Sequence, residues 1–167
     1  MTSVRSYAKE QKLKKSPLSV NEVVTEAVKD FTSTLQDYPL QIEFEEDPRS
    51  PICSLAPLEF ELAVFNLLKN AKEALKAQKA DEPKVFIKIS SGETHCFVDI
   101  SDNGAVISDS DFERMGSVFK SGKASGLGIG LSIVRSIVQN HNGSLVLERG
   151  KNGGLVCRIR LPILNAQ

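Results

Sequence analysis

Hydrophobic residues recur every three or four positions in three segments, which predicts three helices. The first begins after Ser19, which forms the spacing of a capping box with Glu22, and ends before Tyr38 because Pro39 follows that residue. The second is a long helix over residues 57–78. The third follows a run of glycines and aligns apolar residues on one face: Leu127, Leu131, Val134 and Val138.

Apolar and polar residues alternate in several shorter segments, which predicts strands. These are residues 40–45, 52–53, 84–90, 94–101, 144–148 and 155–161. Gly92 and the glycine-rich turn 150–154 connect neighbouring strands as hairpins. Antiparallel hairpins exclude a doubly wound fold, so we predict an α/β two-layer sandwich with a mixed, largely antiparallel sheet covered on one face by helices.

Two polar segments lie outside these elements. Residues 103–125 are poor in apolar side chains and too long for an ordinary connection, so we expect a mobile functional loop there. Residues 1–16 are lysine-rich with weak helical spacing, and we expect the end of a preceding helix plus a linker at Ser16 and Pro17. Residues 17–167 are expected to form one domain.

Composition narrows the class of protein. The 167 residues carry a formal net charge of zero, which argues against a nucleic-acid binder that relies on a basic field. No apolar run is long enough to span a bilayer and no signal peptide is recognisable, so we expect no membrane contact by this domain. Three scattered cysteines (Cys53, Cys96 and Cys157) are typical of buried thiols in a reducing cytoplasm.

The glycine run is the strongest candidate for a phosphate-binding element. Gly126, Gly128 and Gly130 lead directly into a helix, where unpaired N–H groups and the helix dipole favour an anion. No third glycine follows at the spacing of the dinucleotide fingerprint, and Ala124 stands where a Walker A loop needs Ser or Thr. The alternative is a flexible loop before a core helix.

Two asparagines share one face of the long helix. Asn66 and Asn70 lie four residues apart, and their carbonyl oxygens are suitable ligands for Mg²⁺ beside a polyphosphate. The alternative is a solvated polar stripe.

A carboxylate ends the strand over residues 94–101. The strand period directs Asp102 toward the apolar interior, where it would accept a hydrogen bond from an exocyclic amine such as that of adenine. Gly104 would let a flat base pack on bare backbone. The alternative is an ordinary Asp-Asn-Gly turn.

Together these motifs resemble the ATP-binding catalytic domain of two-component sensor histidine kinases, in the gyrase–Hsp90–histidine kinase–MutL superfamily. The resemblance covers Pro17 to Pro162 and rests on the order of the Asn66/Asn70 helix, the Asp102–Gly104 strand end, a short lid with Phe119 and Lys123, and the glycine run. The lid, residues 118–126, looks most like that of nitrogen-regulation sensor kinases. The resemblance implies the Bergerat-type ATP-binding fold.

The resemblance also implies a role for each matching residue. Asn70 would bind Mg²⁺ with Asn66 as its companion, Asp102 would recognise adenine, Gly104 would line the base pocket, and Lys123 would reach the γ-phosphate. Phe119 would anchor the lid. The N–H groups for the phosphates would come from the glycine run and its neighbours: Gly126, Leu127, Gly128, Gly130 and Leu131.

The residue one turn before Asn70 indicates a kinase. ATPases of this superfamily have a glutamate there as general base, whereas this chain has Asn66, and neither Glu61 nor Glu73 occupies that position. The resemblance therefore implies phosphoryl transfer to a histidine on a separate dimerisation domain, and from there to a response regulator. His95 and His141 lack the acceptor motif, so we predict no autophosphorylation by this chain alone.

Three departures from the family pattern leave alternatives open. Val106 replaces a glycine and would narrow the adenine pocket, Leu155 replaces a threonine that binds adenine through water, and Cys157 replaces an aromatic residue and is expected to pack in the core. One alternative is a degenerate nucleotide-sensing or protein-interaction module. Another is a serine kinase of the anti-sigma-factor type.

Overall fold

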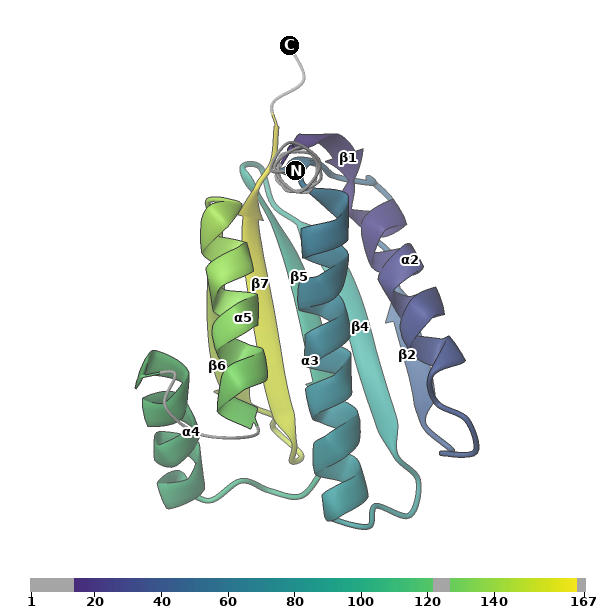
Figure 1. Ribbon diagram of the computed structural model, residues 1–167, viewed down its shortest axis with the longest axis vertical. Helices are drawn as coiled ribbons and strands as arrows, with labels where there is room; N and C mark the ends of the chain where they lie inside the picture. Colours follow the sequence, from purple (N-terminus) through teal and green to yellow (C-terminus); the bar gives the residue numbers. More distant parts are fainter. Residues whose placement is uncertain (1–13, 122–126, 165–167) are drawn as a thin grey trace, which may run out of the picture.

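The computed structural model describes residues 14–121 and 127–164, which form a helical layer on a sheet (Figure 1). The helices are α2 (Val20–Ser33), α3 (Pro57–Ala77), α4 (Asp109–Ser121) and α5 (Leu127–Asn140). The strands are β1 (Ser16–Ser19), β2 (Gln41–Glu45), β3 (Ile52–Leu55), β4 (Lys84–Ser91), β5 (His95–Asp102), β6 (Ser144–Arg149) and β7 (Leu155–Pro162). No described helix has the length and apolar character needed to cross a membrane.

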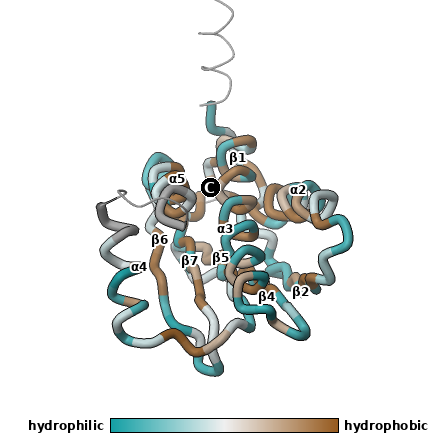
Figure 2. Tube along the Cα trace, turned by 60° about the horizontal axis from the view of Figure 1, so that its bottom comes forward, coloured by the Kyte–Doolittle hydropathy of each residue, from teal (hydrophilic) through white to brown (hydrophobic). Residues whose placement is uncertain are grey.

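The main sheet has the strand order β2-β4-β5-β7-β6. Its β2–β4 pair is parallel and its other pairs are antiparallel, while β1 and β3 form a separate antiparallel pair. Helices α2, α3 and α5 cover one face, and α4 stands beside the β6 edge (Figure 2). The predicted two-layer sandwich with a mixed, largely antiparallel sheet is therefore confirmed.

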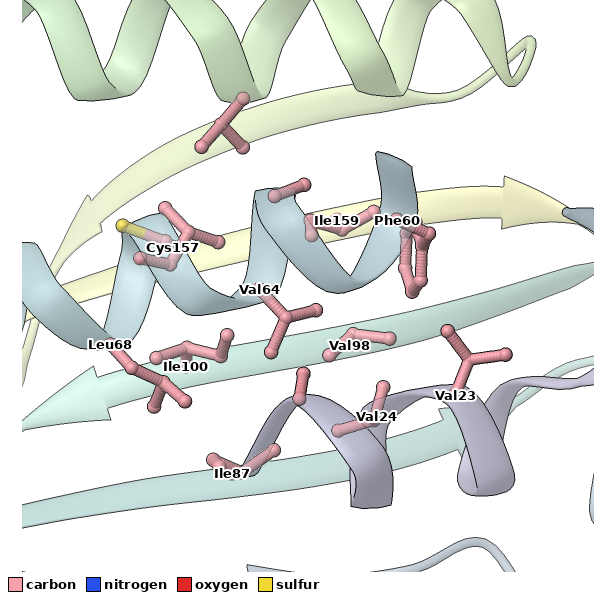
Figure 3. Packing of buried hydrophobic residues seen from close by; sticks show 14 of the residues in the cluster. Val23, Val24, Phe60, Val64, Leu68, Ile87, Val98, Ile100, Cys157 and Ile159 are labelled. Atoms are coloured by element: carbon pink, nitrogen blue, oxygen red, sulfur yellow. The ribbon is translucent and has the colours of Figure 1, made fainter. Parts of the chain in front are cut away.

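The strand alternation seen in the sequence builds the core. Ile87 of β4 is opposite Ile100 of β5, which is opposite Cys157 of β7, and all three side chains are buried on the helix-covered face. Side chains of α2 and α3, among them Val24 and Val64, pack onto them (Figure 3). Each fully buried large aliphatic side chain contributes about 1.5–3 kcal/mol, so this layer is the main stabilising feature.

The start of the domain differs from expectation. Ser16 and Pro17, predicted as a linker, begin β1 and pair with Leu55 and Ser54 of β3. Ser19 precedes α2 as predicted, but its side chain makes no capping hydrogen bond, because its hydroxyl bonds the Ser50 hydroxyl at 2.7 Å. Tertiary contacts therefore replace the local capping box.

The stretch predicted as a loop contains α4. Ser108 Oγ accepts the N–H of Asp111 at 3.2 Å, and two acidic residues, Asp109 and Asp111, occupy the first turn, where they stabilise the helix dipole. Arg149 holds this helix to the sheet edge: it donates to the carbonyl of Ile107 at 3.3 Å and pairs with Asp109. The sequence prediction failed because α4 has a narrow apolar face and depends on such contacts.

Helix α5 ends in a left-handed turn. Asn142, with a φ of 57°, adopts the left-handed conformation, and the Gly143 N–H closes a Schellman-type bond to the Val138 carbonyl at 2.9 Å. Gly143 is required for space, since a Cβ there would lie 2.3 Å from the carbonyl oxygen of Arg160.

His141 is buried at the end of α5. It is 3 % exposed, its Nδ1–H donates to the Ile137 carbonyl, and its Nε2 accepts the Ala56 N–H at 3.0 Å. Burial lowers the pKa of the imidazole, so the neutral ring ties the end of α5 to the start of α3.

Candidate functional site

A mostly apolar cavity lies beside α3, near the carboxyl end of β5. Its walls come from α3, α4, α5, β5 and β7 and from three connecting segments. The lining residues are Leu67, Asn70, Ala71, Ala74, Gln78, Ile100, Asp102, Ile107, Met115, Leu131, Gly154, Leu155 and Cys157. Among these described residues, the polar side chains other than the cysteine are Asn70, Gln78 and Asp102. An apolar cleft with a few placed polar groups is the usual form of a small-molecule site.

Asp102 lies at one end of this cavity, where the strand period placed it. Its Oδ1 accepts the Gly104 N–H at 2.8 Å and its Oδ2 accepts the Leu155 N–H at 3.3 Å. Burial raises the pKa of the carboxyl group, and the two backbone hydrogen bonds offset part of that shift. The carboxylate is therefore held in a fixed orientation by two backbone donors.

Gly104 supports Asp102 and is not part of the cavity wall. A Cβ on Gly104 would lie 2.7 Å from Asp102 Oδ1, so glycine is required for this close approach. Gly104 is not among the described lining residues of this cavity, so a contact between Gly104 and the base stays a prediction.

The turn between β6 and β7 closes the same end of the site. Gly154, with a φ of +74°, lies so close that a Cβ would be 2.0 Å from the Asp102 carbonyl oxygen, and its N–H donates to Ala105 at 2.9 Å. This role of Gly154 was not predicted from the sequence, although the adjacent glycines at 153 and 154 indicate a tight turn.

Asn70 lies at the opposite end of the α3 wall. Its Nδ2 is buried and has no hydrogen-bond partner among the described residues. The first turn of α5 packs against this amide, since a Cβ on Gly130 would lie 3.0 Å from Asn70 Oδ1. A buried, unpartnered N–H donor beside a helix start fits a phosphate group, and the carbonyl oxygen of the same amide is a suitable ligand for a hard cation.

Of the other predicted site residues, some line the cavity and others do not. Leu131 is buried and lines the cavity, whereas Asn66 does not line it and donates to the Leu62 carbonyl at 2.9 Å. Leu127 and Gly128 are the first residues of α5. Phe119 falls within α4, and Lys123 and Gly126 lie outside the described residues.

The three departures from the family pattern have different consequences. Val106 is 81 % exposed and does not line the cavity, so the expectation that it narrows the pocket is wrong. Leu155 lines the cavity, and its backbone N–H serves Asp102. Cys157 belongs to the core, as expected, but also forms part of the cavity wall, and burial raises the pKa of its thiol to about 12.

No described carboxylate other than Asp102 lines the cavity. Glu73 is exposed and lies 4.0 Å from Lys69, and Glu61 is absent from the described lining. The site therefore has a residue that accepts a hydrogen bond at one end but no general base beside Asn70 in the part that is described.

A wider hollow of about 610 Å³ lies on the uncovered face of the sheet. Several of its charges are paired with one another, as in Lys88 with Glu45 and Arg158 with both Asp99 and Glu148. Most of its charged side chains are therefore already in ion pairs, and we do not assign a ligand site there.

Comparison with known proteins gives one family. A sequence model described as "Histidine kinase-, DNA gyrase B-, and HSP90-like ATPase" matches residues 56–165. Relatives include the sensor protein FixL of Bradyrhizobium diazoefficiens, 26% identical over 95% of this chain and 31% of its own length. Sporulation kinase B of Bacillus subtilis is 26% identical over 97% of this chain and 37% of its own length. The chain thus spans about a third of these relatives.

Solved structures show the same fold. The catalytic domain of histidine kinase ThkA matches with a TM-score of 0.74 and 24% identity, covering 89% of this chain and 95% of that one. The mycobacterial sensor histidine kinase MprB matches with a TM-score of 0.71 and 22% identity, covering 91% and 99%. These likenesses support the same mixed sheet and helical layer.

Proposed function

Because this chain belongs to the family of histidine kinase-, DNA gyrase B- and HSP90-like ATPases, we propose that it binds ATP with Mg²⁺ and donates the γ-phosphoryl group to a histidine on a separate dimerisation domain of a sensor histidine kinase. The observation that carries this proposal is the cavity itself. It places a fixed carboxylate, Asp102, at one end and the buried, unpartnered amide of Asn70 at the other.

The Asp102 end is suited to the base. Its carboxylate accepts a hydrogen bond from the exocyclic amine of adenine, while apolar walls such as Ile100 and Leu155 exclude water from the faces of the ring. The two backbone donors keep the carboxylate in place before the ligand arrives. This end therefore supplies base recognition.

The Asn70 end is suited to the phosphates. The Asn70 amide oxygen is a Mg²⁺ ligand that does not repel phosphate, and the first N–H groups of α5 stabilise negative charge. Lys123, outside the described residues, is proposed to contact the γ-phosphate. Mg²⁺ neutralises charge on the phosphate oxygens as the phosphoryl group is transferred.

Poor hydrolysis follows from the residue types. Asn66 stands one turn before Asn70 and cannot act as a base at neutral pH, and its amide is bonded to Leu62. The chain is therefore proposed to position ATP for a nucleophile that another domain delivers.

Neither histidine of this chain is suited to receive the phosphoryl group. His95 begins β5 and lies roughly 23 Å along the strand from Asp102, by the rise of a β-strand. His141 is buried with both ring nitrogens engaged. The acceptor is proposed to be a histidine of the dimerisation domain, and a response regulator the final recipient.

The test is phosphotransfer from labelled ATP. The chain alone should form no acid-labile phosphohistidine, and adding the dimerisation domain of the same protein should produce it on that domain. Phosphohistidine on the isolated chain would contradict the proposal. A phosphoserine on a partner would instead support an anti-sigma-factor type of kinase, and binding without any transfer would support a nucleotide-sensing module.

A further inference from the structure

We propose that Gln78 is a second residue that recognises the adenine base. Its side-chain N–H would donate to a ring nitrogen near the exocyclic amine, and that amine would donate its own hydrogen bond to Asp102. The inference rests on the proposed function, because it assigns a further contact in the same nucleotide site. It concerns a residue to which neither the sequence motifs nor the family resemblance gives a role.

Gln78 is the C-cap residue of α3 and lines the same cavity as Asn70. The helix contributes to the wall at helical spacing, with Asn70 and Gln78 at the two polar positions farthest apart. Eight residues separate them, which is about 12 Å along a helix axis. This length matches a nucleotide that lies along α3 with its phosphates at Asn70 and its base at Gln78.

Gln78 and Asp102 meet at Gly104. Oε1 of Gln78 lies 2.8 Å, and Oδ1 of Asp102 lies 2.7 Å, from the point where a Cβ on Gly104 would stand. The two side chains, from the C-cap of α3 and the end of β5, are therefore close enough to contact neighbouring atoms of one ring. The missing side chain at Gly104 is what allows this approach.

The orientation of the Gln78 amide is fixed by the backbone. Oε1 accepts the Ala105 N–H at 2.8 Å, so the oxygen is already used and the Nε2 group carries the donors. Gln78 is exposed, and its Nε2 group makes no hydrogen bond to another described residue. An anchored amide with unused donors therefore stands at the base end of the cavity.

An acceptor next to a donor matches the edge of adenine. The exocyclic amine of adenine donates a hydrogen bond, and the ring nitrogens on either side of that amine, N1 and N7, accept one. Asp102 as acceptor and Gln78 as donor therefore complement this edge of the base. Leu155 presents only hydrocarbon at this end of the cavity. Gln78 is thus the neutral donor side chain of the described lining that lies beside Asp102.

The test pairs changes in the protein with changes in the ligand. Kd values are measured by calorimetry for the unchanged chain, Gln78→Ala and Gln78→Glu, each with Mg-ATP and with its 1-deaza and 7-deaza analogues. Gln78→Glu keeps an acceptor for the Ala105 N–H but replaces the Nε2 donor with a carboxylate oxygen, which cannot donate. Thermal melting verifies that each variant is folded.

The proposal predicts that the variants lose affinity for ATP but not for one of the deaza analogues. Both variants should bind ATP roughly tenfold more weakly, the effect of about one hydrogen bond, and one of the two deaza analogues should bind the unchanged chain and the variants equally well. Equal weakening for ATP and both analogues would overturn the proposal and leave Gln78 only as a support for residues 103–105. An unchanged chain that binds no ATP would overturn the proposed function as well, so the two failures are distinguishable.

Discussion

Asp102 and Leu155 are joined by a hydrogen bond in which the Leu155 backbone N–H donates to Asp102 Oδ2 at 3.3 Å. This bond joins the end of β5 to the start of β7 and fixes the carboxylate without help from the Leu155 side chain. The threonine that the family often has at this position is therefore not needed to orient Asp102. The Leu155 side chain cannot make the water-mediated contact to adenine that such a threonine would make.

The first prediction separates the two asparagines of α3. Asn70→Asp should weaken Mg-ATP binding by more than tenfold, because a charge replaces a buried amide beside the phosphates. The matched change Asn66→Asp, one turn away and off the described cavity wall, should weaken binding less. Equal losses, measured by calorimetry, would mean that both side chains contact the ligand.

The second prediction concerns the close contact at Gly143. Gly143→Ala should lower the free energy of unfolding by about 1–3 kcal/mol, because its Cβ would meet the Arg160 carbonyl oxygen. Gly92→Ala is the control, since its nearest neighbour would be 3.9 Å away. Urea unfolding that ranks the two variants in the opposite order would contradict the packing described at the end of α5.

The third prediction is a pH dependence of stability due to His141. The unfolded chain binds a proton near the ordinary pKa of 6.5, whereas burial lowers the pKa of the folded imidazole. The unfolded state therefore binds more protons as the pH falls below about 6.5, and stability is lost through that window.

The His141→Gln variant tests this assignment. It removes the titrating ring while offering an acceptor for Ala56 N–H, so its unfolding free energy should change less between pH 6.5 and 5 than that of the unchanged chain. Parallel pH profiles for the two proteins would show that His141 is not the group responsible.

The fourth prediction concerns the attachment of α4. The Arg149 guanidinium lies 5.3 Å from the Phe112 ring centroid, and it also contacts Ile107 and Asp109. Arg149→Ala should increase hydrogen exchange across α4, because these contacts hold the helix to the β6 edge. Lys151→Ala, in the neighbouring turn, should not; the same increase in both variants would contradict this anchoring role.

The parts of the fold that follow a simple period were predictable from the sequence. The alternation in β4, β5 and β7 gave their buried faces, and it placed Asp102 toward the interior, where it lines the cavity. Helix α3 was predicted to end within one residue of its observed bound. These elements bury one continuous face, so their pattern is strong.

The parts that depend on tertiary contacts were not predictable. Asn66 and Asn70 look alike on a helical wheel, and only the packing of Gly130 against one of them distinguishes the two. Helix α4 depends on Arg149, 28 residues beyond its last residue. Gln78 looks like an ordinary exposed residue at a helix end until its bond to Ala105 is known.

The central claim is that Asp102 forms the base end of a nucleotide site, and a calorimetric titration with Mg-ATP tests it most directly. The account predicts saturable binding by the unchanged chain, binding lost in Asp102→Asn, and binding kept in Asp99→Asn, whose carboxylate pairs with Arg158 on the uncovered sheet face. No binding at millimolar nucleotide, or equal binding by all three proteins, would contradict the account.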